Sequence, residues 1–154
     1  MNPSPPTEQD FSGCPDGVDA WKNFGGLTID QASAKFDEAP SVYQEDFMFM
    51  GPVAFAFYFP VVDRFLRETA NLSEEERDDG RESWILSRCI RTHFKEKNRH
   101  ILKDVVGPVL ELCTFMESNI DLFIEDWDPP SENLRSWRAL RETVFRFKTE
   151  SDAV

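Results

Sequence analysis

The sequence contains few of the residues on which most metal and redox sites depend. Its 154 residues include only 3 cysteines and 2 histidines, and the cysteines at positions 14, 89 and 113 form no close pair. A disulfide framework or a zinc knuckle needs cysteines at short, regular spacings, so neither is predicted. We expect reduced thiols in a cytoplasmic protein that holds no metal.

Sequence motifs for nucleotide binding or catalysis are also missing. The chain has no Walker loop, GxSxG elbow, HExxH or CxxC motif and no dinucleotide fingerprint. No cofactor is predicted, and an enzyme is the less favoured class, although a new kind of catalytic site stays open.

Long hydrophobic segments are absent as well. The sixteen uncharged residues between Asp46 and Asp63 contain Gly51, Pro52 and Pro60. A bilayer span needs about 20 apolar residues, so this run is too short. The N-terminus has neither the positively charged region nor the apolar region of a signal peptide. The sequence therefore predicts no membrane association and a cytoplasmic location.

Basic residues are outnumbered. The chain has 29 Asp and Glu against 17 Lys and Arg, a net charge of −12. Residues 1–80 hold 16 acidic and 5 basic residues, whereas residues 81–154 hold 13 and 12. Such a surplus opposes binding to nucleic acids and anionic membranes and favours basic partners. We predict a basic protein partner and no nucleic acid, and the oligomeric state stays open.

What the sequence does have is an aromatic stretch from Tyr43 to Leu66. Six of the sixteen uncharged residues within it are Phe or Tyr, and so much aromatic surface must be buried. Two interpretations of residues 53–60 compete. Alternating phenylalanines have the period of a strand, but the following VVDRFLRETA has helical spacing and no partner strand is evident. We predict a helix that begins at Gly51-Pro52 and is kinked or interrupted at Pro60.

Helical periodicity continues elsewhere. Thr28 and Gln31 form a capping box for a short helix that Pro40 ends. Helical spacing also covers residues 81–97, residues 101–124 with a break at Gly107-Pro108, and a last segment after Pro129-Pro130.

These segments predict an all-α fold. We expect a single domain of five or six helices over residues 18–150, packed around the aromatic stretch. Residues 1–17 carry four prolines and small polar side chains, which predicts a disordered or loosely attached arm.

Two hypotheses concern sites inside the domain. Tyr43, Glu45, Asp46 and His93 supply polar groups for a pocket between helices, against the alternative that the acids begin a helix and the rings lie in the core. Cys89 and His93 lie four residues apart and share a helix face. They form either a nucleophilic or metal-binding couple or, as we favour, part of the core.

The third hypothesis concerns a stripe of acidic residues between Glu117 and Asp128. Like charges four residues apart repel, and acids near a helix C-terminus are unfavourable, so a sequence that keeps both has a use for them. Its alternative is a solvated face balanced by bases on neighbouring helices; eleven of the seventeen Lys and Arg cluster in residues 88–103 and 135–148. The predicted partner-binding residues are Glu117, Asp121, Glu125, Asp126 and Asp128.

One resemblance supports a binding role. The run YQEDFMFMGPVAFAFYFP from Tyr43, preceded by WKNFGGLT from Trp21, resembles a pattern in small bacterial proteins. Some of those proteins lie near toxin systems and are suspected immunity proteins. The resemblance implies a cytoplasmic bacterial protein without a demonstrated enzyme activity. We therefore expect a stoichiometric protein-binding module that neutralises a toxin by occlusion, with a small-ligand-binding protein or enzyme as the alternative.

Overall fold

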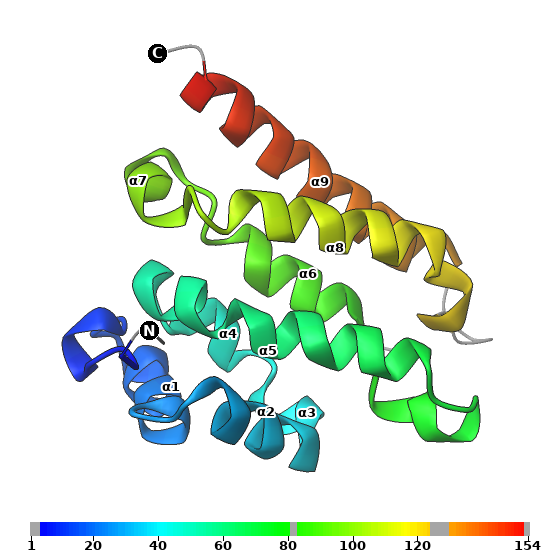
Figure 1. The fold of residues 1–154 in the computed structure, drawn as a ribbon, viewed down its shortest axis with the longest axis horizontal. Helices are drawn as coiled ribbons and strands as arrows, with labels where there is room; N and C mark the ends of the chain where they lie inside the picture. The colour runs from blue at the N-terminus through cyan, green and yellow to red at the C-terminus, as the bar shows by residue number, and fades with distance from the viewer. Residues whose placement is uncertain (1–3, 81–82, 124–129, 153–154) are drawn as a thin grey trace.

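The aromatic stretch forms the middle of a helical structure (Figure 1). The computed structural model describes residues 4–80, 83–123 and 130–152, and within these ranges the chain is helical and has no strand. Its elements are η1 (Glu8–Asp10), α1 (Pro15–Phe24), α2 (Ile29–Glu38), α3 (Pro40–Tyr43), α4 (Asp46–Phe49), α5 (Pro52–Ala70), η2 (Glu75–Gly80), α6 (Ser83–Arg91), η3 (Glu96–Asn98), α7 (Arg99–Leu102), α8 (Val106–Ser118), η4 (Ile120–Phe123) and α9 (Pro130–Asp152), where η denotes a 3₁₀ helix.

Helix α5 confirms the helical interpretation of the aromatic stretch. Phe55, Phe59, Val62 and Leu66 are buried at helical spacing, so the alternation that suggests a strand does not set which side chains face the core. The helix runs through Pro60, which is exposed. A proline lacks the N–H that would bond the carbonyl one turn earlier, and its place on the outer face leaves the buried side of the helix intact.

Two groups of helices lie on either side of α5 in Figure 1, and α2 packs directly on it. In Figure 1, α1, α2 and α3 lie below α5, and α6, α8 and α9 lie above it. Helix α9 packs against both α6 and α8. The buried side chains from both groups join in one hydrophobic core, so the described residues form a single compact domain.

The number of helices predicted from the sequence is too low. The described residues include three helices of four residues each, α3, α4 and α7, in addition to the longer ones. A single turn is too short to show a hydrophobic period, so pattern analysis misses it. The helix predicted over residues 81–97 ends at Arg91. Asn98 donates a hydrogen bond to the carbonyl of His93 (2.8 Å), which stabilises a turn after the helix end.

The segment before α1 packs on the domain. Phe11 is buried, and its ring contacts those of Trp21 and Tyr58 at centroid distances of 5.3 and 6.4 Å. Helix α1 begins at Pro15, three residues before the predicted start of the domain. The disorder or loose attachment predicted for residues 1–17 stays a prediction. The buried ring of Phe11 is a contact that holds this segment to the domain.

Gly51, at the start of α5, lies close to the backbone of this segment. It has φ 86° and ψ 157°, and a Cβ on it would lie 3.1 Å from the carbonyl oxygen of Asp10. We expect Gly51→Ala to lower the free energy of unfolding by about 1–3 kcal/mol, since this backbone region is essentially restricted to glycine. Urea denaturation measures the change.

Gly107→Ala is the matched control for that change. Gly107 lies in α8, and nothing comes within 4 Å of a Cβ placed there. Alanine favours a helix over glycine by about 1 kcal/mol, so this variant should be as stable as the wild type or more stable. Equal stability losses in the two variants would contradict the role given to the Gly51 backbone.

Candidate functional site

The four side chains predicted to form a pocket lie in different surroundings. The Tyr43 ring packs against Phe24 (5.8 Å between centroids), with Lys35 above it. Glu45 is exposed, and Asp46 is the first residue of α4. Asn23 donates a hydrogen bond to Asp46 (2.8 Å), and burial is the main cause of the raised pKa of this carboxyl group.

His93 lies in the core, in contact with α4 and α5. Its ring is 4% exposed and stacks on Phe55 with 4.3 Å between ring centroids. Its Nε2 is 2.5 Å from the carbonyl oxygen of Phe47. A carbonyl only accepts hydrogen bonds, so Nε2 carries the hydrogen and Nδ1 is an acceptor in the neutral ring. Burial lowers the pKa of His93 to about 4, and the ring is neutral at pH 7.

Cys89 is also buried, one turn before His93. Burial raises the pKa of its thiol to about 12, so the thiol stays protonated at neutral pH. A nucleophilic or metal-binding cysteine needs the thiolate. Among the described residues, no group of three His, Cys, Asp or Glu side chains is placed to hold a metal ion. This environment favours a packing role for Cys89.

The acidic stripe is partly neutralised by α9. Glu117 forms ion pairs with Arg138 (3.4 Å) and Arg141 (3.0 Å), and its side chain is only 15% exposed. Asp121 is exposed in η4. Glu125, Asp126 and Asp128 lie outside the described residues. The partner-binding role of the stripe stays a prediction, but Glu117 already has two basic neighbours within the chain.

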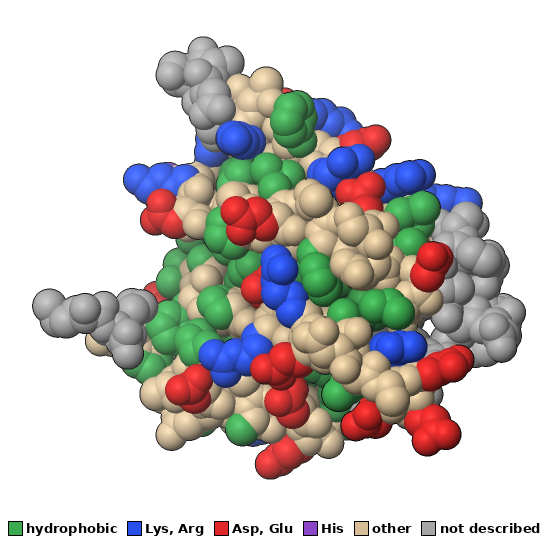
Figure 2. Space-filling view, turned by 45° about the vertical axis from the view of Figure 1, so that its right-hand side comes forward, with side chains coloured by type: hydrophobic (Ala, Val, Ile, Leu, Met, Phe, Trp, Pro, Cys, Tyr) green, Lys and Arg blue, Asp and Glu red, His purple; other side chains and the backbone are tan. Residues whose placement is uncertain are grey.

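On the face of the molecule in Figure 2, acidic and basic side chains are unevenly distributed. Figure 2 shows Lys and Arg gathered mainly over the upper part of the molecule, while Asp and Glu dominate the lower part. The lower part contains α1, α2 and α3, and the upper part contains α9 (Figure 1). The potentials of clustered charges add, so the acidic surface attracts basic partners and the basic surface attracts acidic ones.

A cavity of about 330 Å³ opens within the acidic part. Asp37 of α2 and Glu68 of α5 flank it, and each carboxylate is exposed without an ion-pair partner in the described part of the chain. Burial, followed by the charge of Glu68, raises the pKa of Asp37. The lining residues are Asp37, Pro40, Phe65, Glu68, Thr69, Leu72 and Glu76, and we call this site the acidic cavity.

The floor of the acidic cavity is mostly apolar. Pro40 and Phe65 are buried, and Leu72 is partly exposed at the edge. Glu76 accepts hydrogen bonds from the backbone and hydroxyl of Ser73 (3.2 and 2.7 Å), which lower its pKa and keep it charged. The site therefore combines negative charge at its rim with apolar surface below.

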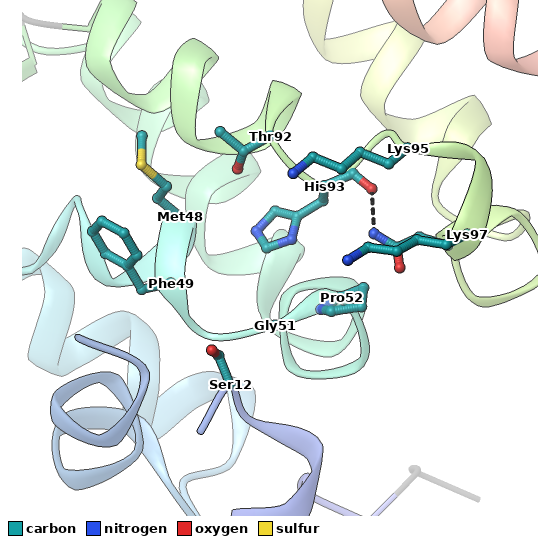
Figure 3. Close-up of a pocket in the computed structure, with 10 residues that line it drawn as sticks. Ser12, Met48, Phe49, Gly51, Pro52, Thr92, His93, Lys95 and Lys97 are labelled. Carbon is teal, nitrogen blue, oxygen red and sulfur yellow. Dashed lines mark hydrogen bonds between the residues drawn. The ribbon is translucent and has the colours of Figure 1, made fainter. Parts of the chain in front are cut away.

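A second and larger cavity, of about 600 Å³, lies beside His93 (Figure 3). It opens where the segment around Ser12, the start of α5 at Gly51 and the turn after α6 meet. The lining residues are Ser12, Met48, Phe49, Gly51, Pro52, Thr92, His93, Lys95, Lys97 and Asn98, and we call it the His93 cavity. Of the four predicted pocket residues, His93 is the one that lines it.

Sequence reasoning did not identify the carboxylates of the acidic cavity as a group. Ser73 and Glu76 have the spacing of a capping box, but Asp37 and Glu68 are 31 positions apart and meet only because α2 packs on α5. No helix among the described residues is long and apolar enough to cross a membrane. No family model, curated protein or solved structure matches the chain.

Proposed function

We propose that this protein is a stoichiometric binding module for a basic protein, and that the acidic cavity receives a Lys or Arg side chain of that partner. One observation carries the proposal: three carboxylates without ion-pair partners in the described chain surround a cavity with an apolar floor. Binding here occludes the basic surface of the partner, which is how a toxin-neutralising protein would act.

The floor suits the long stem of a basic side chain. Phe65 and Leu72 offer apolar surface to the methylene groups, while Asp37 and Glu68 reach the charged head from two helices. Arginine fits this arrangement well because its planar guanidinium stacks on apolar surface and bonds two carboxylates at once. The site thus favours a side chain that has both an apolar stem and a charged head.

The net charge of −12 also speeds the encounter with a basic partner. Clustered charge steers association and gives it a strong dependence on salt. Occlusion by a docked surface needs no catalytic group, and the buried thiol and neutral imidazole of the described core fit a protein that acts by binding.

Removing the rim charges tests the proposal. We expect the triple variant Asp37→Asn, Glu68→Gln, Glu76→Gln to bind N-acetyl-arginine amide about tenfold more weakly, if each partly exposed ion pair contributes about 0.5 kcal/mol. NMR titration of the labelled protein measures this, with the amides of Phe65 and Thr69 as reporters. Capture from the native cell lysate at low and moderate salt then shows whether the variant also loses a basic protein.

The matched control removes the same charge elsewhere. Asp16, Asp19 and Glu45 are exposed and do not line the acidic cavity. Their conversion to amides should leave the titration midpoint almost unchanged and reduce only the salt-dependent part of partner association. If both triple variants weaken arginine binding equally, only overall charge matters and the cavity has no specific role.

A further inference from the structure

The His93 cavity has the opposite charge from the acidic cavity. Among the described residues, its charged lining side chains are those of Lys95 and Lys97, and no carboxylate lines it. Glu96, between them in sequence, is turned to Arg99 in an ion pair of 3.6 Å. Figure 3 shows the two lysine side chains extending toward His93. In a protein with a net charge of −12, this cavity favours an anion.

The cavity also exposes polar groups that are not used by the fold. His93 is 4% exposed, and its Nε2 donates to Phe47, as described above. The other ring nitrogen, Nδ1, has no hydrogen-bond partner within the described ranges of the chain. This nitrogen is not among the buried side-chain atoms that lack a partner, so it is accessible from the cavity, where a bound molecule with an O–H can donate to it.

The start of α5 adds to the positive potential. Gly51 is the N-cap of this 19-residue helix, and no side chain caps the free N–H groups there. The N-terminus of a helix carries a partial positive charge of about half an elementary charge, which adds to that of the lysines. Gly51 and Pro52 line the same cavity as Lys95 and Lys97.

We propose that the His93 cavity binds a small phosphate-type oxyanion. Its negative oxygens accept hydrogen bonds from the ammonium groups of Lys95 and Lys97, and its P–OH group donates to Nδ1 of His93. Free hydrogen phosphate carries this O–H at neutral pH, and a phosphomonoester carries it as the monoanion that prevails below its second pKa of about 6. This site is separate from the acidic cavity, and its presence does not depend on the protein-binding role proposed above.

Titration of the labelled protein with inorganic phosphate at neutral pH tests the site. We expect saturable shifts at the amides of Gly51, Thr92 and Asn98. Sulfate has the same shape but no O–H at this pH, so it should bind several-fold more weakly. Methyl phosphate and inorganic phosphate compared at about pH 5.5, where both keep a P–OH group, distinguish the two sources, because tighter binding of the ester indicates a phosphorylated metabolite.

The variant Lys95→Gln, Lys97→Gln should lose about tenfold or more of the phosphate affinity, since charge-assisted hydrogen bonds are the stronger ones. Lys103→Gln, Lys148→Gln removes the same charge from exposed positions that do not line the cavity, and it should bind like the wild type. The absence of saturable shifts, equal affinity for phosphate and sulfate, or unchanged binding by the Lys95 and Lys97 variant would each overturn the proposal.

Discussion

Replacing Trp137 with alanine is expected to lower the free energy of unfolding by about 3–5 kcal/mol, the range for truncating a large buried aromatic side chain. Trp137 of α9 is fully buried. Its indole N–H donates to the hydroxyl of Ser83 on α6 (3.2 Å), and that hydroxyl donates to Asn133 (2.7 Å). The substitution therefore removes both apolar contacts and a buried hydrogen bond between α6 and α9.

The consequence should extend to η4. Asn133 also donates to the carbonyl of Phe123 (2.7 Å), so one polar network ties α6, α9 and η4 together. Buried polar networks strengthen a fold when all members are satisfied and weaken it when one is lost. A domain of ordinary stability has about 5–15 kcal/mol to lose, so Trp137→Ala should leave a measurable unfolded population at 37 °C. Urea denaturation followed by circular dichroism gives the difference.

Phe145→Ala provides the control on the same helix. Phe145 is 61% exposed, so its truncation should change the free energy of unfolding by less than about 0.5 kcal/mol, as is usual for surface positions. A large loss in Phe145→Ala, or a small one in Trp137→Ala, would mean that α9 packs on the domain through a different face from the one described.

The helical character of this protein could be predicted because it is encoded locally. Thr28 and Gln31 form the predicted capping box, with hydrogen bonds of 2.9 and 3.2 Å. The break predicted at Gly107-Pro108 lies a few residues earlier, between the end of α7 at Leu102 and the start of α8 at Val106, and Gly107 and Pro108 belong to the first turn of α8. Each signal lies within a few residues of the feature that it specifies.

The sites could not be predicted to the same degree because their members meet across the fold. The acceptor of His93 is the carbonyl of Phe47, 46 positions away. Arg138 and Arg141 reach Glu117 only because α9 packs on α8. Helix periodicity shows which face of each helix is apolar, but not which two faces meet, and partners of this kind depend on that pairing.

The burial of the His93 ring makes the protein sensitive to acid. His93 has a pKa of about 4 in the folded protein, mainly because burial disfavours its charged form, against 6.5 in its ordinary state. As the pH falls below 6.5, the unfolded chain takes up the proton first, and the folded state loses relative stability. The stability supplied by the neutral ring is complete above pH 6.5 and is lost as the pH falls toward 4.

Because its pKa falls from 6.5 to about 4 on folding, we expect this histidine to remove about 2.5 kcal/mol of stability between pH 7.5 and pH 4.5. Asp37 and Asp46 act in the opposite direction, because their raised pKa values let the folded state bind protons more readily. The net curve of the wild type is therefore flatter than His93 alone would give, and a variant is needed to isolate the histidine.

His93→Gln supplies that comparison, because its amide N–H can donate to the Phe47 carbonyl without titrating. Both proteins keep Asp37, Asp46 and the exposed His100, so these contributions cancel in the difference between their free energies of unfolding. That difference should be constant above pH 6.5 and shift in favour of the variant by about 2.5 kcal/mol at pH 4.5. Parallel curves from urea denaturation at each pH would show that His93 is protonated as easily in the folded protein as in the unfolded chain, and hence that its ring is not held neutral against Phe55.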